Sequence, residues 1–154
     1  MKKEALKRIF DFLEAKENLN QPVVWKLKND IPLTDDELHF YDDLDLSELE
    51  IETLPENLYI EGNLILNHSE IKSLQKGLKV DYDLSLQFTE IKSLPEGLEI
   101  GGDLDLRFSS ITSLPKGLKV GGDLLIEGTF LTEYTRNELR EMIKPGFIKG
   151  EMYN

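Results

Sequence analysis

A 20-residue repeat is the feature that most constrains how this 154-residue chain can fold. Five consecutive copies occupy residues 34–133, without insertion or deletion. The clearest copy, residues 94–113, reads LPEGLEIGGDLDLRFSSITS. A unit of this length cannot bury its own apolar side chains, so successive copies must stack on one another. The sequence therefore predicts a solenoid in which equivalent residues of successive coils form rows along the long axis.

Apolar residues fall into three groups within each copy. Two groups are pairs separated by a single residue, as in Leu98 with Ile100 and Leu104 with Leu106. Side chains two residues apart lie on the same face of a β-strand, so these pairs predict two short strands in every coil. The third group flanks a turn rich in Ser and Thr. All three groups are expected to point toward one common core.

Glycine residues mark two bends in the later copies. Gly97 and its equivalents precede the first predicted strand. Gly101, Gly102, Gly121 and Gly122 lie between the two predicted strands of their coils. Because glycine adopts a positive φ at little cost, we expect a positive φ at this second bend.

The N-terminal part, residues 1–33, is interpreted as a cap. Apolar residues at helical spacing predict an amphipathic helix over residues 3–16. The segment 23–28 is compatible with either a short strand or a short helix. A solenoid cannot leave the apolar end of its first coil open, so we expect Trp25 to help cover that end.

A second cap is predicted at the other end, over residues 134–154. Thr135 and Glu138 form the sequence pattern of a capping box, which opens a short helix. The segment from Phe147 to Tyr153 is expected to be a final strand or an extended tail. The caps and the repeats together make one folded domain.

The repeat resembles the 20-residue leucine-rich repeats of bacterial effector proteins. Those repeats open with Leu-Pro and continue as Leu-x-Leu/Val-x-x-Asn-x-Leu. It also resembles small phage and bacterial repeat proteins with LPxGLxVGGDLxLxxTxI units. The resemblance covers residues 34–133 and implies a leucine-rich-repeat-like solenoid, but no single activity. The corresponding residues are Leu94, Pro95, Leu104, Leu106, Ser109 and Ile111.

Two departures from that pattern leave the shape of the solenoid open. Hydroxyl residues, such as Ser109, replace the usual Asn. Gly101 replaces the Leu that normally lies three residues before Leu104. The sequence is therefore consistent with a curved horseshoe or with a straighter right-handed β-solenoid that has two short sheets.

Charge narrows the classes of partner. The formal net charge is −12, and residues 34–57 carry ten acidic and no basic side chains. Such a field disfavours nucleic acid and anionic membranes as direct ligands, and it favours a partner with a basic surface. The alternative is that the charge only keeps the protein soluble and implies no particular partner. The chain has no Cys, hence no disulfide and no thiolate metal site. We expect a cytoplasmic protein (in the host cytoplasm if a phage encodes it) without a cofactor.

One row of the repeat is acidic. Asp83, Asp103 and Asp123 belong to it, together with Asp43 and Asn63. In one interpretation, each side chain bonds turn backbone N–H groups at the start of a strand. In the other, the row binds cations or docks the Lys and Arg side chains of a partner. We expect no dedicated metal site.

The candidate binding surface is a column of rings. His68, Phe88 and Phe108 are equivalent residues of successive copies, and Arg107 and Asp105 lie beside them. Exposed aromatic residues next to Arg are typical of protein-binding surfaces. The alternative is that the two Phe rings turn inward at a corner of the core.

The sequence favours a non-catalytic protein-binding module of leucine-rich-repeat type. Catalysis has little support, because His39 and His68 occupy different repeat positions and should not converge. An alternative is a phage- or prophage-encoded acidic inhibitor that mimics nucleic acid and blocks a host defence or nucleic-acid enzyme, in the manner of anti-CRISPR proteins. A β-helix that acts on polysaccharide is a third option, but no aromatic-lined acidic cleft can be named for it.

Overall fold

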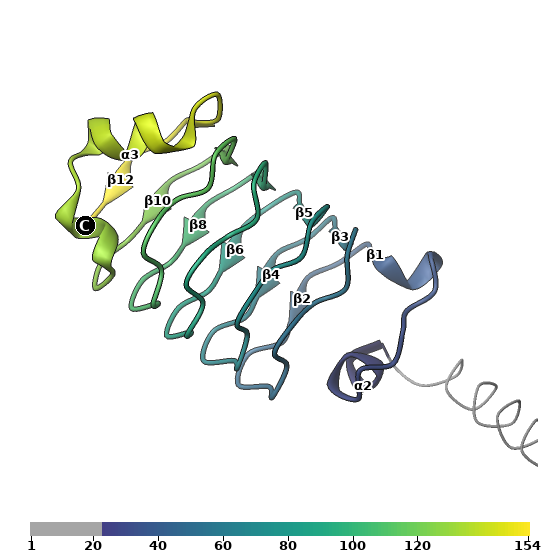
Figure 1. The fold of residues 1–154 in the computed structure, drawn as a ribbon. Coiled ribbons are helices and arrows are strands. Elements are labelled where there is room, and N and C mark those ends of the chain that lie inside the picture. Colours follow the sequence, from purple (N-terminus) through teal and green to yellow (C-terminus); the bar gives the residue numbers. More distant parts are fainter. Residues whose placement is uncertain (1–22) are drawn as a thin grey trace, which may run out of the picture.

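The computed structural model describes residues 23–154, which form a parallel β-solenoid of about four turns (Figure 1). Each strand is two residues long, and the strands form two parallel sheets of six strands. The two strands of one coil belong to different sheets, so the chain passes from the first sheet to the second once in every coil. The solenoid expected from the repeat is therefore confirmed. The helix expected over residues 3–16 lies outside the described residues.

Strand order follows chain order in both sheets. The first sheet contains β1 (His39–Phe40), β3 (Tyr59–Ile60), β5 (Lys79–Val80), β7 (Glu99–Ile100), β9 (Lys119–Val120) and β11 (Phe147–Ile148). The second sheet contains β2 (Leu44–Asp45), β4 (Leu64–Ile65), β6 (Leu84–Ser85), β8 (Leu104–Asp105), β10 (Leu124–Leu125) and β12 (Met152–Tyr153).

The register between neighbouring strands reproduces the period of the sequence. Leu84 pairs with Leu104, and Leu104 pairs with Leu124, so each step is offset by one full repeat. The offset is larger at the last step, where Leu124 pairs with Met152. The chain between β10 and β12 is longer because it includes the helix α3 (Arg136–Ile143).

The core runs along the axis of the solenoid. Leu104 and Leu106 are fully buried, as are most of their equivalents in the other coils. The third apolar group is buried as well, for example Ile111 and Leu114. Rows of identical or similar side chains thus stack at the spacing between strands, about 4.8 Å. The three apolar groups that the sequence predicts are the groups that the structure buries.

A buried row of hydroxyl groups closes the turn after the second strand. Each hydroxyl donates to the backbone carbonyl three residues earlier, at 2.7–2.8 Å. Because the side chain satisfies a backbone acceptor within its own coil, the turn can lie against the core without an unbonded polar group. The row consists of Ser69, Thr89, Ser109 and Thr129.

The second glycine bend differs from the sequence expectation. Gly101, Gly102, Gly121 and Gly122 do not have a positive φ, whereas the glycine before the first strand does, with φ 71° at Gly97. The physical reason for the first group is close approach between coils. A Cβ on Gly121 would lie 2.0 Å from the carbonyl oxygen of Gly101. A side chain added at Gly121 would therefore require the backbone of the neighbouring coil to shift, although Glu61 and Asp81 occupy the equivalent position in earlier coils.

At the N-terminal end, the segment 23–28, for which a short strand and a short helix are both compatible with the sequence, is the helix α2 (Val23–Lys28). Lys26 is buried, and its Nζ donates to Glu37 Oε1 at 2.6 Å. Glu37 belongs to a 3₁₀ helix, η1 (Asp36–Leu38), which leads into β1. The hydrogen bond from Lys26 lowers the pKa of the Glu37 carboxyl group. Trp25, expected to cover the core, is 41% exposed instead, and Lys26 and Leu27 are the buried residues of α2.

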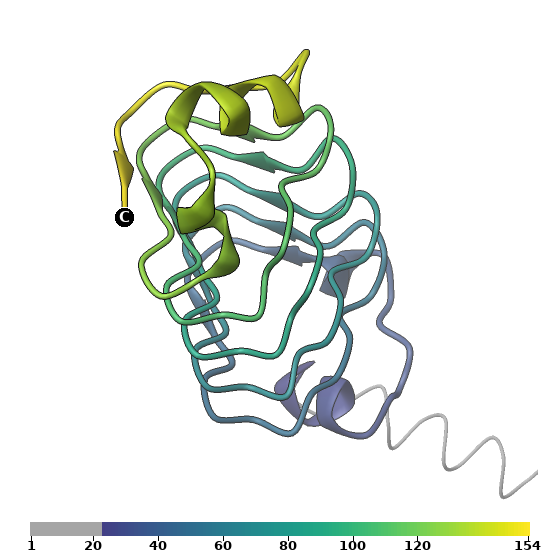
Figure 2. The same cartoon turned by 60° about the vertical axis from the view of Figure 1, so that its left-hand side comes forward.

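The C-terminal end adds one more pair of strands. A 3₁₀ helix, η2 (Phe130–Glu133), leads to α3, which lies over the last coil in Figure 2. Thr135 and Glu138 form the predicted capping box. The segment from Phe147 to Tyr153, predicted to be a strand or an extended tail, contains both β11 and β12, and these extend both sheets.

Candidate functional site

Three rings form a continuous stack on the outside of the solenoid. The centroids of His68 and Phe88 are 4.6 Å apart with an interplanar angle of 7°, and those of Phe88 and Phe108 are 4.8 Å apart with an angle of 11°. Phe88 is 48% exposed and Phe108 is 45% exposed. The rings therefore lie outside the core, which is the first of the two interpretations above. We call His68, Phe88 and Phe108 the ring stack.

The ring stack lies on turns and not on a sheet face. Its residues belong to the turns that follow β4, β6 and β8. All three have a positive φ between 55° and 57°. For a non-glycine residue this conformation costs about 1–2 kcal/mol. Gly128, the equivalent residue of the next coil, has φ 71° and shows which residue type suits the backbone at this place.

Gly128 also marks the end of the ring stack. A Cβ at Gly128 would lie 2.4 Å from Cδ1 of Phe108. The Phe108 ring therefore packs directly over the Gly128 backbone, and a side chain there would have to displace it. The orientation of the last ring is fixed by its neighbours on both sides.

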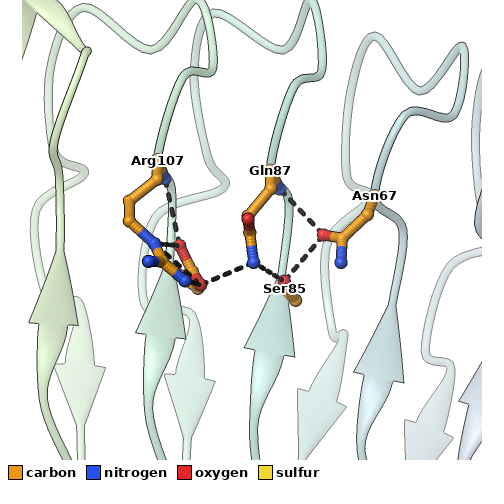
Figure 3. A network of polar contacts seen from close by, with 5 residues as sticks. Asn67, Ser85, Gln87 and Arg107 are labelled. Atoms are coloured by element: carbon orange, nitrogen blue, oxygen red, sulfur yellow. Dashed lines mark hydrogen bonds and ion pairs between the residues drawn. The ribbon is translucent and has the colours of Figure 1, made fainter.

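A chain of polar contacts crosses the second sheet beside the ring stack (Figure 3). Asn67 Oδ1 accepts from Ser85 Oγ at 2.7 Å and from the Gln87 backbone N–H at 2.9 Å. Gln87 Nε2 then donates to Asp105 Oδ2 at 2.8 Å. The contacts link three consecutive coils, so each side chain is held by residues of a neighbouring coil.

Arg107 completes this chain of contacts. Its Nε donates to Asp105 Oδ1 at 2.9 Å, and its Nη2 donates to Asp105 Oδ2 at 2.6 Å. Asp105 raises the pKa of the Arg107 guanidinium through these hydrogen bonds. The Asp105 side chain is only 14% exposed, and that of Arg107 is 35% exposed. Arg107 is thus presented to solvent in a fixed orientation next to Phe108.

The side chains of the acidic row accept hydrogen bonds from backbone N–H groups of the next coil, and not from those of their own turn. Asp83 Oδ1 accepts from the backbone N–H of Asp103 at 2.7 Å, and Asp103 Oδ1 accepts from that of Asp123 at 2.7 Å. Asp43, Asn63 and Asp123 accept in the same way from the next coil. Within residues 23–154, no group of three or more acidic or His side chains is arranged to hold a metal ion.

The first sheet carries a cluster that the repeat pattern does not predict. Tyr59 Oη donates to Asp81 Oδ2 at 2.5 Å, and this raises the pKa of Tyr59. Lys79 Nζ lies 3.0 Å from Asp81 Oδ1 and 4.2 Å from the centroid of the Tyr59 ring. The signal was present in the sequence, because the residue before each buried Ile or Val of this sheet is charged or aromatic. His39 belongs to this sheet, so it is separated from His68 by the fold.

The expected site residues thus divide into two sets. His68, Phe88, Phe108 and Arg107 lie together at the turns after the second sheet, with Asp105 bound to Arg107. The acidic row, which includes Asp83, Asp103 and Asp123, lies at the start of the strands of that sheet. A hollow of about 400 Å³ over the second sheet is lined by Asp83, Asp103, Asp105 and Arg107, among others.

No protein-family model, no curated protein and no solved structure matches this chain. In the part of the chain that the structure describes, no helix is both long enough and apolar enough to cross a membrane.

Proposed function

We propose that this protein is a non-catalytic binding module and that the ring stack, with Arg107 beside it, contacts a partner protein. The observation that carries the proposal is the exposure of two stacked Phe rings on turns whose backbone favours glycine. Aromatic and Arg side chains contribute most of the binding energy in protein interfaces, because they bury large areas at a low cost in conformational entropy.

Stability alone gives little reason for rings at these turns. Stacking of an aromatic pair contributes about 0.5–1.5 kcal/mol, whereas the left-handed backbone costs about 1–2 kcal/mol per non-glycine residue. The two terms roughly cancel, so ring stacking by itself does not account for Phe88 and Phe108 at these turns. A partner that covers the rings would supply the missing apolar burial.

The proposal extends to the finer class of the fold. We assign the chain to the leucine-rich-repeat type, with five 20-residue coils between an N-terminal and a C-terminal cap, and to the cytoplasm. The offset of one repeat between paired strands and the buried Leu rows support the repeat type, and they carry no information about the compartment.

The acidic first coil supports a second candidate function, an inhibitor that mimics nucleic acid. Of the ten acidic residues in 34–57, Glu37 and Glu52 form ion pairs with lysine in the described part of the chain. The other carboxylates keep their field available to a protein with a basic surface. In this case duplex or single-stranded nucleic acid should compete with the protein for its partner.

The ring stack can be tested by replacing Phe88 and Phe108 together with glycine. Glycine suits the positive φ, so the fold should persist while the rings are lost. Hot-spot residues contribute about 2 kcal/mol or more, and we therefore expect recovery of the partner from native host lysate to fall at least about tenfold. The measurement is quantitative mass spectrometry of the proteins captured by each variant.

The matched control is Lys92→Ala, which changes an exposed residue at another corner of the coil. It should capture the same partner as the unmodified protein. Full capture by the double glycine variant would contradict the proposal. Release of the partner by competitor nucleic acid, with full capture by the glycine variant, would favour the inhibitor.

A further inference from the structure

A second surface feature lies at the bend between the two sheets, near the N-terminal end. It is a hollow of about 430 Å³ that is lined by two exposed tyrosines. Tyr41 belongs to the first coil and is 69% exposed, and Tyr82 belongs to the third coil and is 62% exposed. The intervening coil contributes Gly62, which is buried and adds no side chain to the hollow. We call this feature the tyrosine hollow.

Gly62 keeps the floor of the tyrosine hollow free of side chains. A Cβ at Gly62 would lie 2.5 Å from the Asp42 carbonyl carbon and 2.5 Å from Asp43 Oδ1. These contacts exclude any larger residue unless the first coil moves. The absence of a side chain at this place is therefore a consequence of how tightly the first two coils stack.

Tyr41 is held in place from behind. The centroid of the His39 ring lies 4.2 Å from that of the Tyr41 ring and 4.6 Å from that of the Tyr59 ring. His39 Nε2 also forms a hydrogen bond of 2.8 Å with Glu61 Oε1. His39 therefore orients one aromatic wall and one carboxylate of the hollow at the same time, which reduces the entropy cost of binding there.

The charge of the hollow is negative. Asp42, Asp43 and Glu61 line it, and no lysine or arginine of residues 23–154 does so. Those carboxylates do not form a group that could hold a metal ion. The complementary ligand is therefore a larger cation, one that can contact an aromatic face and spaced carboxylates together.

We propose that the tyrosine hollow binds an arginine side chain of the partner protein. A guanidinium group is planar, stacks on aromatic rings and donates hydrogen bonds to carboxylates in fixed directions. The tyrosine hollow offers both kinds of contact in one place, because its lining includes two aromatic rings and three carboxylates. This inference rests on the proposed function, because it names the chemistry of the partner that the module binds.

The tyrosine hollow adjoins the hollow over the second sheet. Asn63 lines both the tyrosine hollow and the hollow over the second sheet, which extends to Asp103 and Arg107. A partner segment that places an arginine between the tyrosines can thus continue across the second sheet toward the ring stack. The carboxylates of the acidic row lie along that route.

The test is a nuclear magnetic resonance titration of the full chain with acetyl-Gly-Arg-Gly-amide. The isosteric peptide with citrulline, which lacks the positive charge, is the matched ligand. We expect chemical-shift changes confined to Tyr41, Gly62, Asn63 and Tyr82. The citrulline peptide should bind at least about tenfold more weakly, because it loses the ion pairs and the cation–π contact.

Variants then separate the hollow from general charge attraction. Tyr41→Ala and Tyr82→Ala should each weaken the binding of the arginine peptide severalfold. Tyr134→Ala, at the other end of the solenoid, should leave this binding unchanged. If a tyrosine variant does not fold, the shift pattern of the unmodified protein decides the question. Changes spread over all acidic coils, or equal binding of both peptides, would overturn the inference.

The outcome is independent of the test of the ring stack. The peptide probe needs no partner, so localised binding of arginine can be observed even if the glycine variant captures the partner in full. Conversely, the glycine variant could lose capture while the peptide binds without localisation. That result would refute the inference about the tyrosine hollow and would still support the ring stack as a binding surface.

Discussion

Replacing Leu104 with alanine is expected to lower the free energy of unfolding by about 2–5 kcal/mol. Leu104 is fully buried and lies between Leu84 and Leu124 in the second sheet. Its neighbours are fixed at the spacing between strands, so they cannot move inward to fill the cavity that the substitution leaves. The midpoint of chemical denaturation, followed by circular dichroism, measures the effect.

Lys92→Ala is the control for this prediction and should change the free energy of unfolding by no more than about 0.5 kcal/mol. Asp105, next to Leu104 in the chain, is not a suitable control. It accepts hydrogen bonds from Arg107 and Gln87, so its removal would leave both donors without this acceptor. Equal shifts of the midpoint for Leu104→Ala and Lys92→Ala would contradict the register described here.

A second large effect is expected from Gly121→Ala. The added methyl group would meet the Gly101 carbonyl oxygen at 2.0 Å, and backbone cannot rotate away as a side chain can. The backbone of the two coils must shift locally, which strains the adjacent hydrogen bond from Gly121 N–H to the Ile100 carbonyl oxygen. We expect a loss of about 1–3 kcal/mol, as is typical of overpacking.

Gly97→Ala provides the comparison for Gly121→Ala. No atom lies within 4 Å of a Cβ at Gly97, but φ is +71°. Only backbone strain should matter there, at a cost of about 1–2 kcal/mol. If thermal unfolding showed Gly97→Ala to be the more damaging of the two, positive φ would be the main reason for glycine, and the close approach of coils would be secondary.

The sequence predicts the parts of this fold that depend on the period alone. Leu98, Ile100, Leu104 and Leu106 have apolar equivalents in every copy, and a repeated apolar side chain has one favourable place in a stacked structure, the core. The capping box at Thr135 is equally local, because its two hydrogen bonds connect residues three positions apart. Both predictions are confirmed because neither needs knowledge of how one coil contacts the next.

Contacts between coils could not be predicted in the same way. Asp83 and Gly102 are adjacent in space because the Asp83 carboxylate bonds the backbone of the next coil, and a Cβ at Gly102 would lie 2.1 Å from it. The sequence shows Gly and Asp in neighbouring positions of the later copies, which suggests a local turn instead. The true partners are about a full coil apart in the chain.

The tyrosine hollow depends on breaks in the repeat. Tyr41 and Tyr82 occupy different repeat positions, so the repeat pattern does not bring them together. Gly62 separates them only when three coils are stacked. The ring stack, in contrast, follows the period and was identified as a column, although its place on left-handed turns depends on backbone geometry that the sequence does not specify.

The most direct test of the ring stack as the binding surface is oxidative labelling of aromatic side chains, with and without the captured partner. Phe88 and Phe108 are exposed in the free protein, and so is Phe130 of η2, which serves as the internal reference. We expect Phe88 and Phe108 to become protected in the complex while Phe130 stays labelled. Unchanged labelling of Phe88 and Phe108 in a saturated complex would contradict it.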